Sequence, residues 1–207
     1  MRNTFDERAA SWDENPRRLK LVENVWEVLK KQLKLSGIKN VLDYGCGTGL
    51  LGYKLIDQVK SITFCDTSQA MLEQVEKKRE YYGYQNVNTL CSDFSQNPVR
   101  DEKYDLILSM LVLHHVENLD SVLSNFKELL SDDGQFCWID IDLEDGSFHD
   151  DNTGIHHFGF SKAALESHLK NNGFDLNFYT NELVVVKERE GVTEEYPLFV
   201  MVAEKCK

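Results

Sequence analysis

Residues 41–49 read Val-Leu-Asp-Tyr-Gly-Cys-Gly-Thr-Gly, an apolar approach followed by three glycines at alternate positions. This glycine-rich segment constrains the fold more than any other part of the sequence. A buried strand that meets a glycine turn and restarts as a helix leaves backbone N–H groups uncovered where a ligand can approach closely. We expect that helix to run to about Gln58. The run therefore predicts a cofactor cradle.

The glycines allow two alignments with different functional meanings. Residues 47–52 satisfy the G-x-G-x-x-G string of dinucleotide-binding folds, which would make the chain a nicotinamide-dependent oxidoreductase. With Gly47 as the first turn residue, however, Asp43 and Tyr44 would lie inside a strand that should be apolar throughout. Starting the turn at Gly45 places Asp43 at the carboxyl end of the strand, facing the crevice.

A second acidic residue supports the alignment that begins at Gly45. Residues 61–66 predict the next strand, and Asp66 ends it 23 positions after Asp43, where a Rossmann-like unit carries its ribose-binding carboxylate. Together these residues resemble the first motif of the class I S-adenosylmethionine-dependent methyltransferases. The order Phe-Asp, Ala, Trp-Asp, Pro-x-Arg ahead of the glycines is similar to a bacterial small-molecule group of that family.

The resemblance implies S-adenosyl-L-methionine as the cofactor, with Asp66 on its ribose and Asp93 and Phe94 at its adenine. The predicted cofactor-binding residues are Trp12, Asp43, Gly45, Cys46, Gly47, Asp66, Thr67, Met71, Ser92, Asp93, Phe94, Ser109, Met110 and His114.

The chain of 207 residues is long enough for one α/β domain with a sizeable core. Apolar runs at 86–91, 104–110 and 135–142 alternate with helical patterns at 67–83, 119–130 and 161–173. Two further strands at 174–187 and 195–204 flank a charged turn at 188–191. We expect a three-layer Rossmann-like sheet of about seven strands, mostly parallel with an antiparallel C-terminal strand, and helices on both faces. Residues 1–36 would form a helical cap and residues 37–207 the core.

The amino-terminal cap has two interpretations. Residues 4–12 predict a short helix, and Asn15-Pro16 begins a longer one that ends at Ser36-Gly37. In the functional interpretation Phe5, Trp12 and Arg17 form a flap over the cofactor. In the other, this segment is simply docked against the sheet.

Charge and hydropathy narrow the class of partner. A formal net charge of −12 opposes nucleic-acid binding, which generally needs a clustered basic face. The segment after the strand at 104–110 also lacks the Asn/Asp-Pro-Pro-aromatic motif of amino-group nucleic-acid methyltransferases. No apolar run is long enough to span a bilayer, and residues 1–7 contain no signal-peptide core. We expect a cytoplasmic protein, monomeric or homodimeric. Its partner should be a small-molecule substrate, and neither a nucleic acid nor a membrane.

Five of the six histidines lie in two segments, 113–115 and 143–160. Both segments follow strands, so they should meet at the carboxyl edge of the sheet and form the acceptor pocket. The candidates for a general base are His115, His149, His156 and His157, while His114 can hold the loop by hydrogen bonds. We expect no metal, because His149, His156 and His157 do not match a standard zinc spacing.

The predicted reaction is in-line displacement of the methyl group from a sulfonium by a small-molecule nucleophile. Such a reaction needs mainly alignment, and a base only if the nucleophile must lose a proton. The oxidoreductase and a non-catalytic S-adenosylmethionine-binding module remain the alternatives.

Overall fold

The computed structural model describes residues 4–96, 102–189 and 191–206. The chain begins with helix α1 (Thr4–Arg8), the 3-10 helix η1 (Ala9–Glu14) and the long helix α2 (Pro16–Gln32). As expected, the Asn15 side chain caps α2 by accepting from the Arg17 backbone N–H at 3.0 Å, and Pro16 occupies the first turn.

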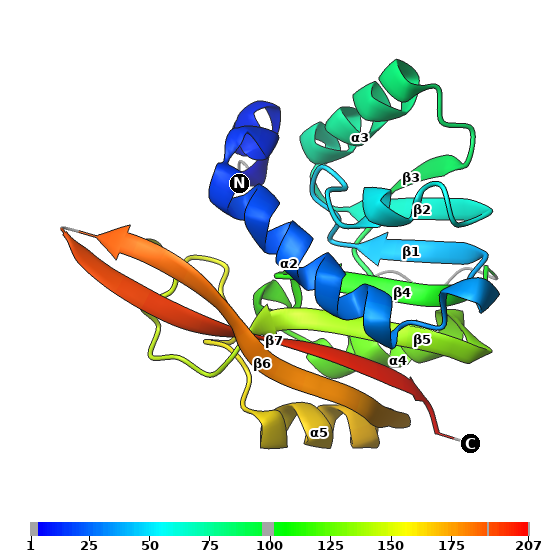
Figure 1. Cartoon of the computed structure of the whole chain (residues 1–207). Coiled ribbons are helices and arrows are strands. Elements are labelled where there is room, and N and C mark those ends of the chain that lie inside the picture. Colours follow the sequence, from blue (N-terminus) through cyan, green and yellow to red (C-terminus); the bar gives the residue numbers. More distant parts are fainter. Residues whose placement is uncertain (1–3, 97–101, 190, 207) are drawn as a thin grey trace.

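The core is one seven-stranded sheet in the order β3-β2-β1-β4-β5-β7-β6 (Figure 1). Neighbours from β3 to β5 pair in parallel, whereas β7 is antiparallel to both β5 and β6. The predicted fold class is therefore confirmed. The strands are β1 (Asn40–Tyr44), β2 (Ser61–Asp66), β3 (Val87–Cys91), β4 (Tyr104–Met110), β5 (Leu130–Ile141), β6 (Phe174–Arg189) and β7 (Val192–Lys205).

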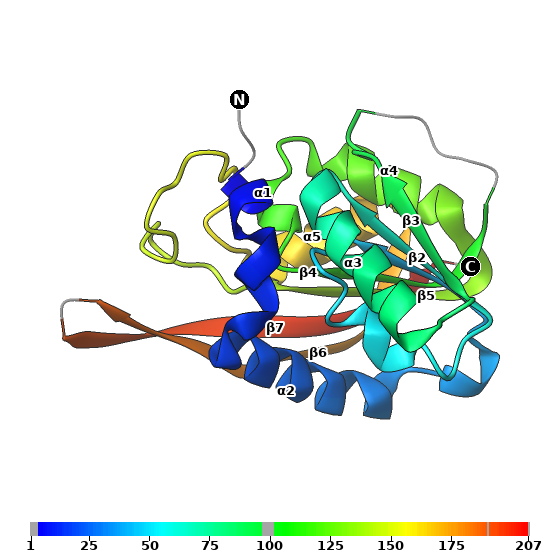
Figure 2. The same cartoon turned by 90° about the horizontal axis from the view of Figure 1, so that it is seen from above.

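Helices cover both faces of this sheet (Figure 2). Side chains of α4 (Leu119–Leu129) and α5 (Lys162–Asn171) pack on one face, with Phe126 and Leu165 fully buried. Side chains of α2 and α3 (Gln69–Tyr82) pack on the other. Alternate residues of a strand point to opposite faces, so in β4 Ile107 joins the first cluster while Leu106 joins the second. Two short 3-10 helices, η2 (Leu35–Gly37) and η4 (Leu113–His115), lie before β1 and after β4.

The expected helix from the glycine turn to Gln58 is wrong. Only the 3-10 helix η3 (Gly52–Leu55) forms there, flanked by turns with three-residue hydrogen bonds such as Gln58 N–H to Leu55 O at 2.8 Å. Gly52 is the physical reason, because an added Cβ at this position would lie 2.6 Å from Phe64 Cε1. The close packing of this backbone on β2 fixes a tight, irregular path.

The carboxyl-terminal hairpin is longer than the sequence predicted. Glu188 and Arg189 lie in β6 and not in the turn, Gly191 takes a left-handed φ of 79°, and Glu190 lies outside the described residues. Residues 131–134, between the predicted helical pattern at 119–130 and the apolar run at 135–142, lie within β5, where the pairing with β4 shifts register. Among the helices of the described residues, none is both long and apolar enough to cross a membrane.

Candidate cofactor and acceptor site

The glycine turn leaves β1 at the carboxyl edge of the sheet. Gly45, Gly47 and Gly49 all have left-handed φ, at 67°, 54° and 85°. Gly45 N–H and Cys46 N–H donate to the Cys65 carbonyl at 2.7 and 3.0 Å, which locks the turn onto β2. Gly47 N–H donates to Asp66 Oδ2 at 2.8 Å. Gly49 N–H donates to the Cys46 carbonyl at 2.9 Å. The expectation that these N–H groups are uncovered is therefore wrong, since four of them have acceptors within the protein.

Asp43 supports the turn from beneath. It lies at the end of β1, as expected, but its side chain is only 3 % exposed and accepts from Gly52 N–H at 3.0 Å. The carboxylate thus faces the protein interior and not an open crevice. Burial raises the pKa of Asp43 to about 7, although the Gly52 hydrogen bond acts in the opposite direction.

Asp66 connects the turn to helix α3. Besides Gly47 N–H, it accepts from Ser68 N–H at 2.8 Å. Burial raises the pKa of Asp66, and the hydrogen bonds from Ser68 and Gly47 oppose that rise. Of the neighbouring predicted residues, Thr67 is exposed and Met71 is 1 % exposed in the first turn of α3.

The predicted adenine residues follow β3. Asp93 Oδ1 accepts from Ser95 N–H at 2.8 Å, which closes a turn in this loop. Phe94 is 5 % exposed and stacks on Tyr44 with ring centroids 5.1 Å apart, so its ring belongs to the core. Ser92 is half-buried beside them.

The end of β4 carries an unusual polar atom. Ser109 lies opposite Tyr44 in the β1–β4 pairing and is fully buried. Its Oγ has no hydrogen-bond partner within the part of the chain that the structure describes. Met110 is half-buried, and Leu111, which follows, has a left-handed φ of 56° that is strained for a leucine. The chain therefore bends sharply as it leaves β4.

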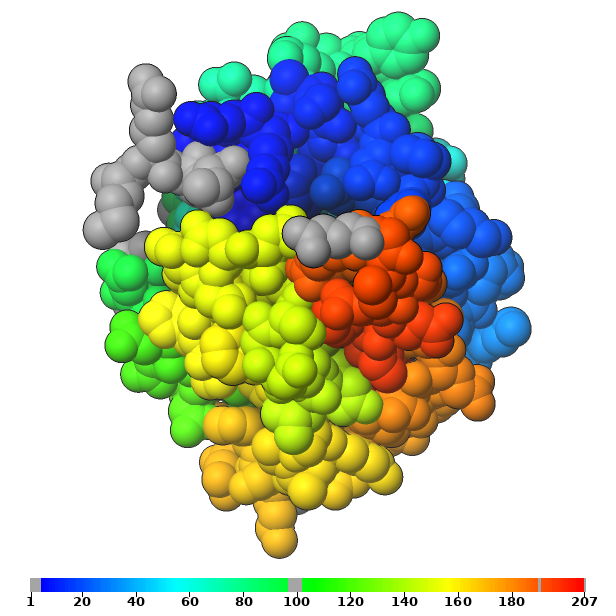
Figure 3. Space-filling view, turned by 90° about the vertical axis from the view of Figure 1, so that its left-hand side faces the viewer, coloured from blue at the N-terminus to red at the C-terminus, as the bar shows by residue number. Residues whose placement is uncertain are grey.

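The amino-terminal segment covers the glycine turn. An ideal Cβ on Gly47 would meet only Trp12 Nε1, at 3.6 Å. Asp13 accepts from Thr48 Oγ1 at 2.5 Å and pairs with Lys78 of α3, also at 2.5 Å. Figure 3 shows this segment against the connection 143–160 on the surface.

Two further contacts fasten the cap. Ser68 Oγ donates to Asp6 at 2.5 Å, and the Phe5 ring lies edge-on to His115 with centroids 5.6 Å apart. Arg18 stacks on Trp12 at 3.6 Å, whereas Arg17, the residue predicted for the flap, is exposed and pairs with Glu188 at 3.8 Å. The anchoring roles of Asp6, Asp13 and Thr48 were not predicted, because short polar residues in an irregular segment give no periodic signal.

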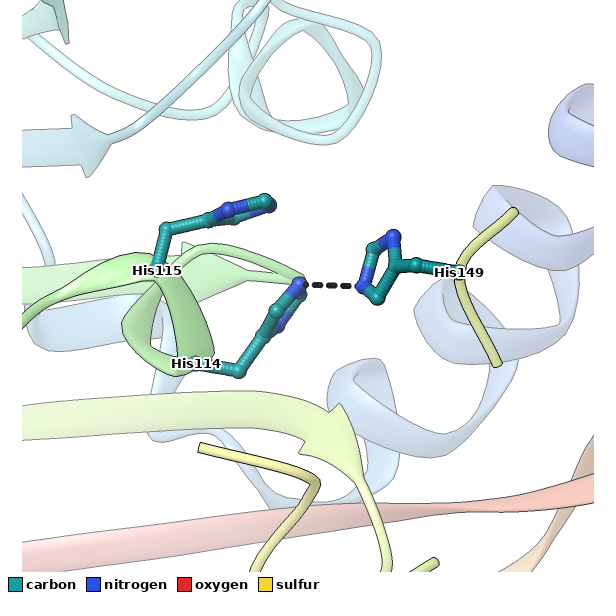
Figure 4. A group of neighbouring side chains, drawn as sticks. All are labelled: His114, His115 and His149. Carbon is teal, nitrogen blue, oxygen red and sulfur yellow. Dashed lines mark hydrogen bonds between the residues drawn. The ribbon is translucent and has the colours of Figure 1, made fainter. Parts of the chain in front are cut away.

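The two histidine segments do meet. His114, in η4, is 1 % exposed, and its Nδ1 lies 2.6 Å from Asp140 Oδ1 at the end of β5. Its Nε2 lies 3.1 Å from Nε2 of His149, which belongs to the connection 143–160 (Figure 4). His115 Nδ1 lies 3.1 Å from the Gly154 carbonyl of the same connection.

Electrostatics argue against a histidine base that works near neutral pH. Burial, followed by the neighbouring His114, lowers the pKa of His115 to about 4, and the same causes lower that of His149 to about 4. Burial would raise the pKa of Asp140, but His114 and the Ile141 N–H bring it below its ordinary value. The Asp140 carboxylate is a functional candidate that the sequence analysis missed, although its place at the end of a strand was the available signal.

His156 and His157 play a different part. Their backbone N–H groups both donate to the His114 carbonyl at 3.0 Å, which docks the connection onto η4. The His156 ring is exposed, and His157 Nε2 hydrogen-bonds the Val116 carbonyl at 2.9 Å. Burial lowers the pKa of His157, against the effect of that hydrogen bond.

Known structures share this architecture. An S-adenosylmethionine-dependent methyltransferase from Clostridium acetobutylicum superposes with a TM-score of 0.72 at 17 % identity, over 99 % of this chain and 100 % of that one. The putative methyltransferase in a complex with the Haloferax volcanii Trm112 activator gives a TM-score of 0.74 at 18 % identity, with all of both chains covered.

Sequence comparison also finds similarity to methyltransferases. The ubiquinone biosynthesis O-methyltransferase of Coxiella burnetii is 31 % identical over 121 residues, which are 58 % of this chain and 48 % of that enzyme. The chain thus spans about half the length of this relative, and less than two thirds of other leading curated relatives. A profile described as "Methyltransferase domain" matches residues 35–197. The chain therefore belongs to the methyltransferase domain family, and the resemblance read from the glycine motif is confirmed.

Proposed function

We propose that this chain binds S-adenosyl-L-methionine and transfers its methyl group to an oxygen of a small molecule. The observation that carries the proposal is the cradle formed by Trp12, Gly47 and Asp66. Gly47 presents backbone without a side chain, Asp66 fixes that backbone from β2, and Trp12 lies over it. A ligand can approach this backbone only because no Cβ is present.

Other features fit the same cofactor. The buried Ser109 Oγ, for which no partner is found among the described residues, is a polar atom available to a ligand. Asp66 would bind the ribose hydroxyls, and Ser92 and Asp93 would form the adenine side, because the Phe94 ring is buried in the core. Bound there, the cofactor supplies an electrophilic methyl group, and the protein supplies alignment and exclusion of water.

The acceptor would lie beside η4 and the connection 143–160, at the carboxyl edge where open α/β sheets bind ligands. An oxygen acceptor is proposed by analogy with the Coxiella relative, which is named an O-methyltransferase. The net charge of −12 supports a small molecule over a nucleic acid. We propose a cytoplasmic setting and a monomer or homodimer, as expected from the sequence.

The amino-terminal segment would act as a flap in this proposal. Polar contacts attach it to the turn and α3, namely Asp13 with Thr48 and Lys78 and Asp6 with Ser68. Such contacts exchange readily with water, so this segment can open for ligand entry without unfolding the core.

Calorimetry separates the alternatives. Titration with S-adenosylmethionine, S-adenosylhomocysteine and NADH should give binding of the first two and none of the third. Binding of NADH alone would overturn the proposal in favour of an oxidoreductase. Binding of S-adenosylmethionine without methyl transfer to any acceptor would leave a non-catalytic module.

A further inference from the structure

The side chains of His114, His115 and His149 form a compact group of imidazoles. One ring nitrogen of each lies within 4.8 Å of one from each of the others. They come from η4 and from the connection 143–160, two segments far apart in sequence, and Figure 4 shows the three rings converging. No other group of three such side chains is found in the described ranges 4–96, 102–189 and 191–206.

Hydrogen bonding fixes which nitrogen of two rings carries the proton. A carbonyl oxygen can only accept, so His115 must carry its proton on Nδ1, which faces the Gly154 carbonyl. The Asp140 carboxylate oxygen lies 2.6 Å from Nδ1 of His114, so this nitrogen is the one that donates to it. In a neutral imidazole each of these tautomers leaves a lone pair on Nε2. That of His114 faces Nε2 of His149 at 3.1 Å, where an ion would replace the proton that the two nitrogens share.

This pattern is the one that metal-binding histidines show in proteins. A ligating histidine almost always donates its other N–H to a carboxylate or a backbone carbonyl, which fixes the tautomer and aims the lone pair. Asp140 and the Gly154 carbonyl provide both kinds of outer partner here. Asp140 is itself held by Ile141 N–H at 2.9 Å and Trp138 Nε1–H at 3.3 Å.

The spacing also suits an ion. Two nitrogens bound to one tetrahedral zinc at ~2.0–2.1 Å lie about 3.3 Å apart. The Nε2 atoms of His114 and His149 are 3.1 Å apart, and a ring nitrogen of His115 lies within 4.8 Å of the ligand nitrogens of both.

We infer that His114, His115 and His149 bind a divalent transition-metal ion through their ring nitrogens, with Zn²⁺ the expected occupant. Three neutral nitrogen ligands suit such an ion, and a three-histidine site leaves a coordination position for a further ligand. The expectation of no metal rested on the spacing of His149, His156 and His157. The fold instead combines one of these with two adjacent histidines of η4.

The open coordination position would bind the methyl acceptor, and this step rests on the proposed function. The Phe5 ring contacts both His115 and Trp12, so the histidines lie next to the cofactor cradle. A bound ion would take the acceptor oxygen as its further ligand and lower the pKa of an acceptor hydroxyl. The proton would then leave to solvent, and the oxygen would attack the sulfonium methyl with release of the thioether.

The test measures metal binding without S-adenosylmethionine. The chelator-treated chain of 207 residues is titrated with Co²⁺, followed by visible absorption, and with Zn²⁺, followed by calorimetry. His149→Gln and His115→Gln should lose the tight site and its Co²⁺ spectrum. His156→Gln, an exposed histidine of the same connection, should bind as the wild type does. Asp140→Asn should bind ~10–100-fold more weakly, as for other outer-shell changes.

Two results would overturn the inference: no stoichiometric ion on the wild type, or equal affinity in the His149→Gln and His156→Gln variants. Circular dichroism of each variant separates misfolding from loss of a ligand, and His149 is the safest position because it lies in a connection. Because the readout is ion binding, failure of the metal site leaves methyl transfer untouched, and failure of methyl transfer leaves the metal site untouched.

Discussion

Gly47 N–H and Asp66 Oδ2 lie 2.8 Å apart, across the ends of two neighbouring parallel strands. This bond joins the turn after β1 to the acid that ends β2. The carboxylate therefore has two tasks, since it holds the turn and would also bind the cofactor ribose.

Replacing Asp66 with Ala should weaken S-adenosylhomocysteine binding by roughly 1.5–3 kcal/mol, the range for hydrogen bonds to a charged group. Calorimetry measures the change. Asp57→Ala, which removes an exposed carboxylate from the turn after η3, is the matched control and should bind normally. Unchanged affinity in a folded Asp66→Ala protein would remove Asp66 from the site.

The turn glycines should respond differently to alanine. An added Cβ at Gly45 would lie 2.2 Å from Val112 Cγ2, so Gly45→Ala should lower the melting temperature strongly. At Gly47 the nearest atom is 3.6 Å away, and a left-handed alanine costs only roughly 1–2 kcal/mol.

Gly47→Ala should therefore fold and still lose cofactor affinity, because its methyl group occupies the space proposed for the ligand. Thermal unfolding and calorimetry on both variants make the comparison. Normal binding by Gly47→Ala would contradict the proposed cradle.

Ligand should protect the amino-terminal segment. Trypsin can cleave at Arg8, Arg17 and Arg18, and S-adenosylhomocysteine should slow that cleavage if the flap closes on it. Electrophoresis of timed digests measures the rate. Equal rates with and without ligand would favour a permanently docked segment.

Asp43 should make the wild type lose stability as pH rises. Its pKa is about 7 in the folded protein and near the ordinary aspartate value when unfolded, so between about pH 4 and 7 the folded state holds the extra proton. The free energy of unfolding should fall over that window, by at most about 4 kcal/mol from this group. Above pH 7 the contribution of Asp43 to the free energy of unfolding is fully lost.

Urea unfolding of Asp43→Asn beside the wild type isolates this effect. The neutral amide keeps an acceptor for Gly52 N–H and does not titrate. The free energy of unfolding of the wild type should therefore fall relative to that of Asp43→Asn as the pH rises. A difference that stays constant from pH 4 to 8 would mean that Asp43 ionises normally.

Much of the fold was predictable because its causes are local and periodic. The apolar runs of β2 and β4 and the helical patterns of α3 and α5 all arise within a few residues. The helix after the glycine turn failed because the contact of Gly52 with Phe64 is tertiary and leaves no mark on periodicity.

The candidate site was predictable only for residues that lie at or just after the ends of strands. Asp66 and the two histidine segments follow from the rule that ligands bind at the carboxyl edge of the sheet. The pairing of His114 with Asp140, and the packing of Phe94 on Tyr44 in the core, depend on side-chain directions that only the folded chain defines.

The most direct test of the account is the fate of a labelled methyl group. The wild type and Gly47→Ala would each be incubated with methyl-labelled S-adenosylmethionine and a cell extract separated by size. The account predicts label in the small-molecule fraction, with the wild type alone. Label only in nucleic acid or protein, or none in any fraction despite cofactor binding, would contradict it.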